Sequence, residues 1–115
     1  MDTPSEDDLE QRYKARLLNE ASMLRAASDL SSTDRCPVEL DQQSVGRLSR
    51  MDAMQQQAMA SAQDSRRHAR LVAIAAALRR LEDGDFGFCP ECGDFIGTSR
   101  LDLDPVLMRC VSCAR

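Results

Sequence analysis

Aromatic residues, glycine and proline are all scarce in this chain of 115 residues. Aromatics make up 3% of the sequence, tryptophan is absent, and there are only five glycines and four prolines. So few aromatic side chains argue against a large globular core, and so few turn-forming residues argue against a protein built from many short strands. Alanine, arginine and leucine are among the most frequent residues instead, and all three favour long helices.

The chain also lacks a long apolar run and an excess of positive charge. Its longest apolar run, Leu71 to Leu78, is far shorter than the roughly twenty residues that cross a bilayer. The acidic, polar start lacks the basic and apolar regions of a secretory signal, so we expect a cytoplasmic protein. The formal net charge of -4 disfavours generic nucleic-acid binding, because affinity for phosphate backbones comes from lysine and arginine.

Two segments have the periodicity of long helices. The first runs from about Ser5, its expected N-cap, to Leu30, and its buried seam is predicted at Tyr13, Leu17, Glu20, Leu24 and Ala27. The second ends at Asp83, before Gly84 as C-cap residue, and its seam is predicted at Leu48, Met51, Gln55, Ala58, Ala62, Ser65, Ala69, Val72 and Ala76. A second apolar row occupies only the last three turns, at Leu71, Ile74, Leu78 and Leu81.

A turn near residues 31–43 joins these two helices. Pro37 lacks an amide donor and disfavours helix at Cys36 before it, and the neighbouring serines and aspartates compete for backbone hydrogen bonds. We therefore predict a mainly α fold. A long antiparallel helical hairpin, or coiled coil, would occupy residues 1–83, and a small C-terminal zinc-finger module with four cysteine ligands would occupy residues 84–115.

Four of the five cysteines form two Cys-x-x-Cys pairs in this C-terminal segment. The pairs are Cys89 with Cys92 and Cys110 with Cys113, and their spacing is typical of a four-cysteine zinc site. In a reducing compartment such pairs more often bind metal than form disulfides, and no βαβ pattern supports a thioredoxin-like motif. We predict one structural Zn²⁺ bound by these four thiolates and covered by Phe86, Phe88, Phe95, Ile96, Leu101 and Leu103.

The remaining reactive side chains have simpler interpretations. Cys36 is interpreted as an ordinary small residue in the turn, and its acidic neighbours would raise rather than lower the pKa of its thiol. His68 is interpreted as a solvated helix residue rather than a metal ligand or a catalytic base. No residue is therefore assigned a catalytic role.

The segment LEDGDFGFCPECGDFIG, followed by RLDLDP and RCVSC, resembles the DksA/TraR family of bacterial transcription factors. The resemblance covers Leu81 to Cys113 and extends more loosely through the second helix. It implies a non-enzymatic regulator of transcription initiation that binds RNA polymerase directly and inserts its coiled coil into the secondary channel. The four family cysteines match one for one.

The sequence departs from this family at the hairpin tip and at the ppGpp site. The family's Asp-x-x-Asp-x-Ala tip motif is absent, and its two aspartates align with Gly46 and Ser49. The resemblance also implies ppGpp as a second partner, but the basic residues expected for its site are missing, because Ala73, Asp104 and Ala114 stand in their place. Either the tip has been rebuilt, with Asp41 or Asp52 taking the acidic role, or the protein contacts the catalytic region of the polymerase differently. For a rebuilt tip, the residues that would face the polymerase are Glu39, Asp41, Arg47, Arg50, Asp52 and Ala53.

Two other functions stay open on the sequence. A zinc-ribbon module could bind nucleic acid through its arginines and use the hairpin to dimerise, although aromatic stacking residues are scarce. A Gre-like transcript-cleavage factor would use Glu39 and Asp41 to help bind a second metal ion. Salt-dependent binding to bare DNA would favour the first alternative, and magnesium-dependent shortening of stalled transcripts would favour the second.

Overall fold

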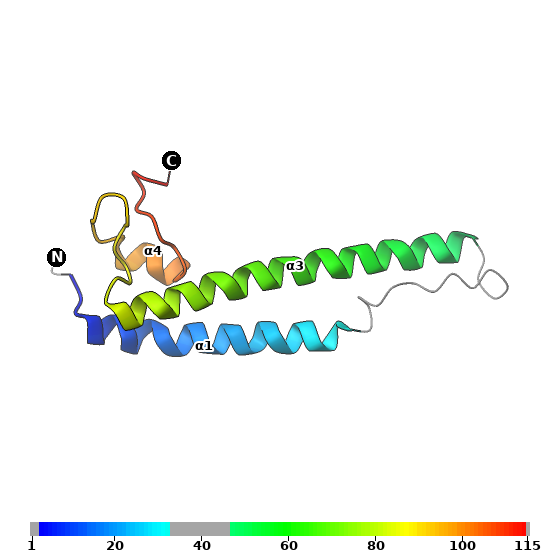
Figure 1. Cartoon of the computed structure of the whole chain (residues 1–115), viewed down its shortest axis with the longest axis horizontal. Helices are drawn as coiled ribbons and strands as arrows, with labels where there is room; N and C mark the ends of the chain where they lie inside the picture. Colours follow the sequence, from blue (N-terminus) through cyan, green and yellow to red (C-terminus); the bar gives the residue numbers. More distant parts are fainter. Residues whose placement is uncertain (1–2, 33–46, 115) are drawn as a thin grey trace. The chain divides into compact units, whose positions relative to one another are not determined.

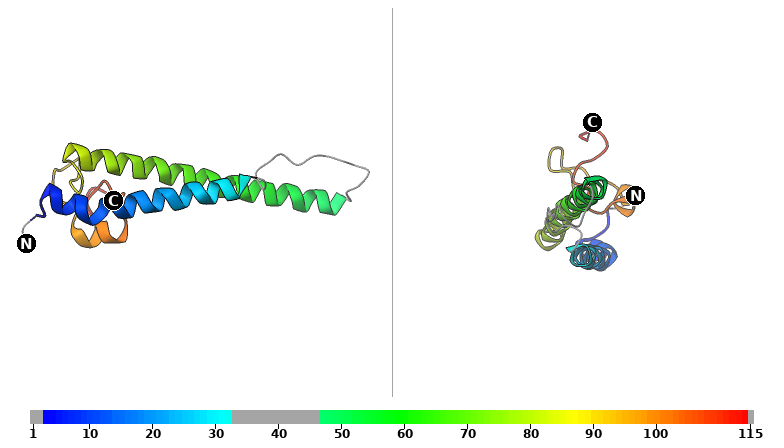
Figure 2. Two further views of the ribbon diagram at one scale, coloured as in Figure 1. Left: turned by 90° about the horizontal axis from the view of Figure 1, so that it is seen from below. Right: turned by 90° about the vertical axis from the view of Figure 1, so that its right-hand side faces the viewer.

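The computed structural model describes residues 3–32 and 47–114, and it is mainly helical (Figure 1). The helices are α1 (Glu6–Leu30), α3 (Arg47–Asp83) and α4 (Thr98–Leu103). Within the described residues, the only β-structure is an isolated antiparallel bridge between Phe88 and Phe95. Figure 2 shows α1 and α3 as continuous helices from two further directions. The predicted mainly α fold is confirmed.

The chain divides into two compact units. The first unit consists of Met1–Ala21 and Leu71–Arg115, and the second consists of Ser22–Arg70. The boundary expected from the sequence, between residues 83 and 84, divides the chain differently and stays a prediction. None of the described helices contains an apolar stretch of the length that spanning a bilayer requires.

The predicted ends of the long helices are confirmed by backbone geometry. At the start of α1, Ser5 Oγ accepts a hydrogen bond from the Asp8 amide at 3.2 Å, as an N-cap side chain does. Acidic residues in this first turn complement the positive end of the helix dipole. At the end of α3, Gly84 has a φ of 81°, and the Asp85 amide donates to the carbonyl of Arg80 at 2.9 Å.

The core of the first unit lies between the start of α1, the end of α3 and the segment that follows α3. Tyr13 is 1% exposed, and its ring centroid is 5.3 Å from that of Phe86. Such a tilted aromatic pair adds specific geometry to the area that it buries. The other buried residues of this core are Leu9, Leu17, Ala21, Ile74, Ala77, Leu81, Cys89, Ile96, Leu101 and Pro105.

The seam predicted for α1 is confirmed, but the seam predicted for α3 is wrong. Met51 is 56% exposed and Val72 is 71% exposed, and Ala58, Ala62, Ser65 and Ala69 are also exposed. The covered positions keep the same 4-3 spacing in another register, at Ala53, Gln57, Ala60, Asp64, Arg67, Leu71, Ile74, Leu78 and Leu81. The apolar periodicity of the sequence did not indicate this register, because the middle positions of the seam are polar. The apolar row noted in the last turns is its final part.

A polar cluster occupies the middle of this seam, within the second unit. Asp64 is 8% exposed, and its carboxylate lies 3.5 Å from the Arg67 guanidinium on the same helix. Arg67 Nε donates to Ser28 Oγ at 3.0 Å, and its NH2 group donates to Ser31 Oγ at 2.8 Å. Arg67 therefore connects α3 to the end of α1 through directed hydrogen bonds. A polar group at a seam position fixes helix register because a shifted pairing would leave it without partners.

We expect Arg67→Met to destabilise the pair of helices by about 3 kcal/mol. The substitution removes the half-buried guanidinium that lies beside the buried Asp64 carboxylate, and an ion in such a place is costly without its partner. Chemical unfolding followed by circular dichroism would measure the loss. The matched control is Arg66→Met, since Arg66 is the exposed neighbour and should change stability by less than about 0.5 kcal/mol. Equal effects of the two substitutions would contradict the role given to Arg67.

Candidate metal centre

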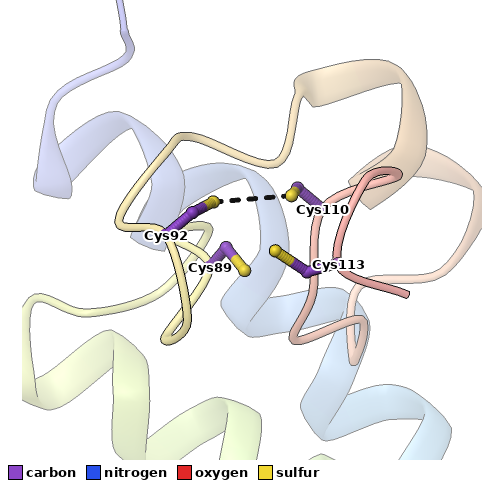
Figure 3. A group of neighbouring side chains, drawn as sticks. All are labelled: Cys89, Cys92, Cys110 and Cys113. Carbon is purple, nitrogen blue, oxygen red and sulfur yellow. Dashed lines mark hydrogen bonds between the residues drawn. The ribbon is translucent and has the colours of Figure 1, made fainter. Parts of the chain in front are cut away.

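Two short turns of the same kind bring the four predicted cysteines together. In the first turn, the Gly93 amide donates to the carbonyl of Cys89 at 2.8 Å. In the second, the Ala114 amide donates to the carbonyl of Cys110 at 3.0 Å. Each turn therefore closes just after its second cysteine, and this presents the two sulfurs of the pair on one side. Figure 3 shows the four side chains converging from the two turns.

The distances between the sulfurs fit one metal ion. The four Sγ atoms all lie within 4.8 Å of one another, and those of Cys92 and Cys110 are 3.5 Å apart. Sulfurs bound tetrahedrally to zinc at about 2.3 Å would be about 3.8 Å apart, whereas a disulfide would require about 2.05 Å. The four cysteines are free thiols. The cluster can therefore hold a metal ion.

The electrostatics of the cluster favour a bound cation. Backbone amides, first that of Cys110 and then that of Cys92, lower the pKa of the Cys89 thiol to about 6. Hydrogen bonding with the thiols of Cys110 and Cys89 raises the pKa of the Cys113 thiol. Neighbouring thiolates repel each other, so four such sulfurs ionise together only when a cation displaces their protons. This donor set is the one that Zn²⁺ takes in closed structural sites.

The first cysteine turn is held by a short hairpin. The Phe88–Phe95 bridge brings two ring centroids to 5.6 Å, and the Ile96 amide donates to the carbonyl of Gly87 at 2.7 Å. The Cys89 amide donates to the carbonyl of Asp94 at 2.8 Å, which places Cys89 in the core. Most of the predicted covering residues are buried or half-buried, but Leu103 is wrong, because it is 82% exposed at the end of α4.

We expect Gly87→Ala to destabilise this hairpin by about 3 kcal/mol. Gly87 has a φ of 87°, and an added Cβ would lie 2.9 Å from the ring of Phe95, so backbone strain and a clash combine. Gly93→Ala is the control, because φ is 78° there and, apart from its chain neighbours, no residue lies within 4 Å of the added Cβ. Thermal unfolding should show the smaller loss for Gly93→Ala. The reverse order would contradict the packing described for Gly87.

The predicted tip residues are only partly described. Glu39 and Asp41 lie outside the described residues, and so does the side chain of Arg47. In the first turns of α3, Asp52 is exposed, whereas Arg50 and Ala53 are half-buried. Their role at a polymerase-facing tip stays a prediction.

The other residues discussed from the sequence have simple positions. The His68 side chain is 69% exposed and lies 3.4 Å from the Asp64 carboxylate, so it remains a largely solvated helix residue. Cys36 lies outside the described residues. The Asp104 carboxylate accepts a hydrogen bond from the Val106 amide at 3.2 Å. Asp104 therefore accepts a hydrogen bond in a local turn, at a position where the DksA/TraR family has a basic residue.

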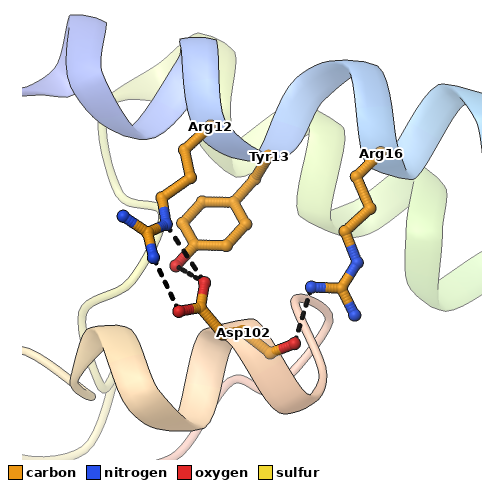
Figure 4. A network of polar contacts seen from close by, with 4 residues as sticks. All are labelled: Arg12, Tyr13, Arg16 and Asp102. Carbon is orange, nitrogen blue, oxygen red and sulfur yellow. Dashed lines mark hydrogen bonds and ion pairs between the residues drawn. The ribbon is translucent and has the colours of Figure 1, made fainter.

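Sequence reasoning missed a cluster of side chains around Asp102 in α4 (Figure 4). Arg12 donates twice to the Asp102 carboxylate, at 3.1 and 2.7 Å, and the Tyr13 hydroxyl donates to it at 2.8 Å. Arg16 donates to the backbone carbonyl of Asp102 at 2.6 Å. The hydrogen bonds from Arg12 and then Tyr13 lower the pKa of Asp102, and burial followed by the bond to Asp102 raises the pKa of Tyr13 to about 12.

No family model matches the chain. Over 40 residues the chain is 42% identical to the RNA polymerase-binding transcription factors DksA of Haemophilus influenzae and Escherichia coli K12. The matched segment makes up 35% of this chain, 28% of the Haemophilus protein and 26% of the Escherichia protein. Over 32 residues it is 53% identical to the protein of the same name from Caulobacter vibrioides, covering 28% of this chain and 22% of that protein. These matches therefore span only about a quarter of the length of the curated relatives.

A solved structure resembles almost the whole chain. It is transcription factor DksA2 from Pseudomonas aeruginosa, with a TM-score of 0.71 and 22% sequence identity. The match covers 99% of this chain and 83% of that one. The likeness shows that the two proteins share a fold.

Proposed function

We propose that this DksA-like chain is a non-enzymatic regulator of bacterial transcription initiation that binds RNA polymerase directly. The observation that supports the proposal best is the combination of a DksA-like fold over 99% of the chain with a four-cysteine cluster at its C-terminal end. The curated relatives that share part of its sequence are named as RNA polymerase-binding transcription factors. A protein that acts on bacterial RNA polymerase would be located in the cytoplasm.

The proposed cofactor is one structural Zn²⁺ held by Cys89, Cys92, Cys110 and Cys113. When bound, zinc would join the two cysteine turns and stabilise the fold, and four thiolates would leave it no open position for catalysis. The residues around the site support this role, because Cys89 belongs to the core and the backbone amides of Cys110 and Cys92 stabilise its thiolate.

We further propose that the paired helices enter the secondary channel of the polymerase. The segment between α1 and α3 would lead, with Glu39, Asp41 and the first residues of α3 replacing the missing acidic motif. Among these, the exposed Asp52 is the best described candidate, because its carboxylate is open to a partner at the start of α3. The positions opposite the family's ppGpp-binding residues, Ala73, Asp104 and Ala114, carry no cation. The regulator is therefore expected to act independently of ppGpp at that site.

The test compares two double variants in binding and transcription assays with purified RNA polymerase. Arg50→Ala with Asp52→Ala changes the tip, whereas Glu10→Ala with Lys14→Ala removes an exposed ion pair in the first half of α1. Both double variants keep the net charge of the chain. Both variants would first be shown to hold zinc and to have normal helicity. We then expect the effect of the tip variant on transcription to be about tenfold weaker, and that of the control variant to be unchanged.

Three results would overturn parts of this proposal. A tip variant with undiminished effect would remove Arg50 and Asp52 from the mechanism. If the natural chain fails to bind the polymerase but binds bare DNA with a steep salt dependence, the nucleic-acid alternative replaces the proposal. Magnesium-dependent shortening of stalled transcripts would instead establish the cleavage alternative.

A further inference from the structure

The Asp102 cluster links the start of α1 to the segment between the two cysteine pairs. Asp102 lies in α4, and α4 lies in the stretch that separates Cys92 from Cys110. Its carboxylate and its carbonyl together accept four hydrogen bonds from Arg12, Tyr13 and Arg16. The contacts that these three side chains of α1 make therefore depend on the position of one short helix.

Further contacts continue from α4 to the cysteine turns. The Arg100 guanidinium donates to the carbonyl of Arg109 at 3.4 Å, next to Cys110. The Arg109 guanidinium lies 3.3 Å from the carboxylate of Glu91, which stands inside the first cysteine turn. An apolar contact adds to these polar ones, because Tyr13 packs on Phe86. Leu101 of α4 and Cys89 of the first cysteine turn are also buried, at 0% and 1% exposed.

The α4 segment is too short to hold its own position. It has 6 residues, fewer than an isolated helix needs to be stable in water. A metal ion bound to both cysteine pairs would close the chain from Cys92 to Cys110 into a loop. Closing a loop removes conformational freedom from the unfolded segment and so favours the folded position of α4.

We propose that metal binding at the four cysteines is coupled to the docking of α1 through Asp102. With metal bound, α4 is held in place and Asp102 fixes the start of α1; when the metal is lost, the hydrogen bonds to Asp102 weaken and the start of α1 is released. The inference depends on the proposed metal site but not on polymerase binding. The protein would therefore respond to zinc depletion through its first helix.

Thermodynamic linkage makes the coupling testable from both directions. If zinc stabilises the contacts at Asp102, then these contacts must strengthen zinc binding by the same factor. We expect Asp102→Ala to weaken zinc affinity about tenfold, a change within the range typical of coupled sites. Competition with a chromophoric chelator would measure the affinity of the full chain.

The matched control for this measurement is Glu10→Gln. It removes one negative charge from an exposed ion pair within α1, between Glu10 and Lys14, and Glu10 is not among the described side chains that contact Asp102. Arg12→Gln is a second test variant, because it removes two hydrogen bonds to Asp102 while leaving that of Tyr13. It should weaken zinc binding less than Asp102→Ala, and it decides the question if Asp102→Ala fails to fold.

Hydrogen exchange gives a readout that does not depend on affinity. In the natural chain, chelation of zinc should reduce the protection of backbone amides in residues 9–17 of α1, and Arg12→Gln should show reduced protection even with zinc bound. Equal zinc affinities for the natural chain and the Asp102 and Arg12 variants, or unchanged protection on chelation, would overturn the coupling. If the natural chain binds no zinc, the proposed metal site itself fails, and this outcome is distinct from the other two.

Discussion

Cys92→Ser is expected to weaken zinc binding by at least about 100-fold and to unfold much of the first compact unit. Cys92 is the exposed member of its pair, so the substitution removes a thiolate without opening a cavity in the core. Structural zinc sites in small domains contribute on the order of 10 kcal/mol to folding, and a serine hydroxyl is a poor replacement for a thiolate. Metal analysis after dialysis, together with near-ultraviolet circular dichroism, would measure both losses.

The matched control is Cys36→Ser, the same substitution at the cysteine that lies outside the described residues. It should leave one zinc ion per chain and the folded signal unchanged. If Cys36→Ser loses zinc as Cys92→Ser does, the assignment of ligands is wrong. If Cys92→Ser retains zinc with natural affinity, the four-thiolate site is wrong.

Phe86→Ala should destabilise the protein by about 4 kcal/mol, the usual cost of removing a fully buried ring. Phe86 is 2% exposed and packs on Tyr13, so its loss leaves a cavity between α1 and the segment after α3. Urea unfolding of the zinc-loaded protein would measure this change in the free energy of unfolding.

Phe88→Ala provides the comparison for Phe86→Ala, because it removes the same ring two positions along the chain. Phe88 is half-buried, and its ring packs on that of Phe95. We expect its loss to cost about half as much, in proportion to the smaller area that it buries. A larger loss for Phe88→Ala would show that the core does not centre on Phe86.

The features that sequence predicted well are those encoded by neighbouring residues. The cysteine pairs indicate their turns because the spacing of two residues within each pair is itself the signal. Ser5 and Gly84 mark helix ends for the same reason, since a capping side chain or a positive φ acts within a few residues. The long helices follow from a composition that favours helix throughout.

The features that sequence missed depend on pairings across the chain. The seam of α3 contains Asp64 and Arg67, and these are covered because Arg67 hydrogen bonds to Ser28 of α1 and to Ser31 just after it. Apolar periodicity therefore selected the opposite, small-residue face. The Asp102 cluster joins positions about ninety residues apart, and nothing in the local sequence around Arg12 or Tyr13 indicates that partner.

The central claim is that this chain acts on RNA polymerase, and in-vitro transcription tests it most directly. Purified polymerase would be assayed on a promoter with and without the zinc-loaded protein, and each reaction would be repeated with ppGpp. We predict that the protein binds the polymerase and changes initiation to a similar extent in both conditions. Initiation that is unchanged at protein concentrations well above that of the polymerase, with no detectable binding, would contradict the account.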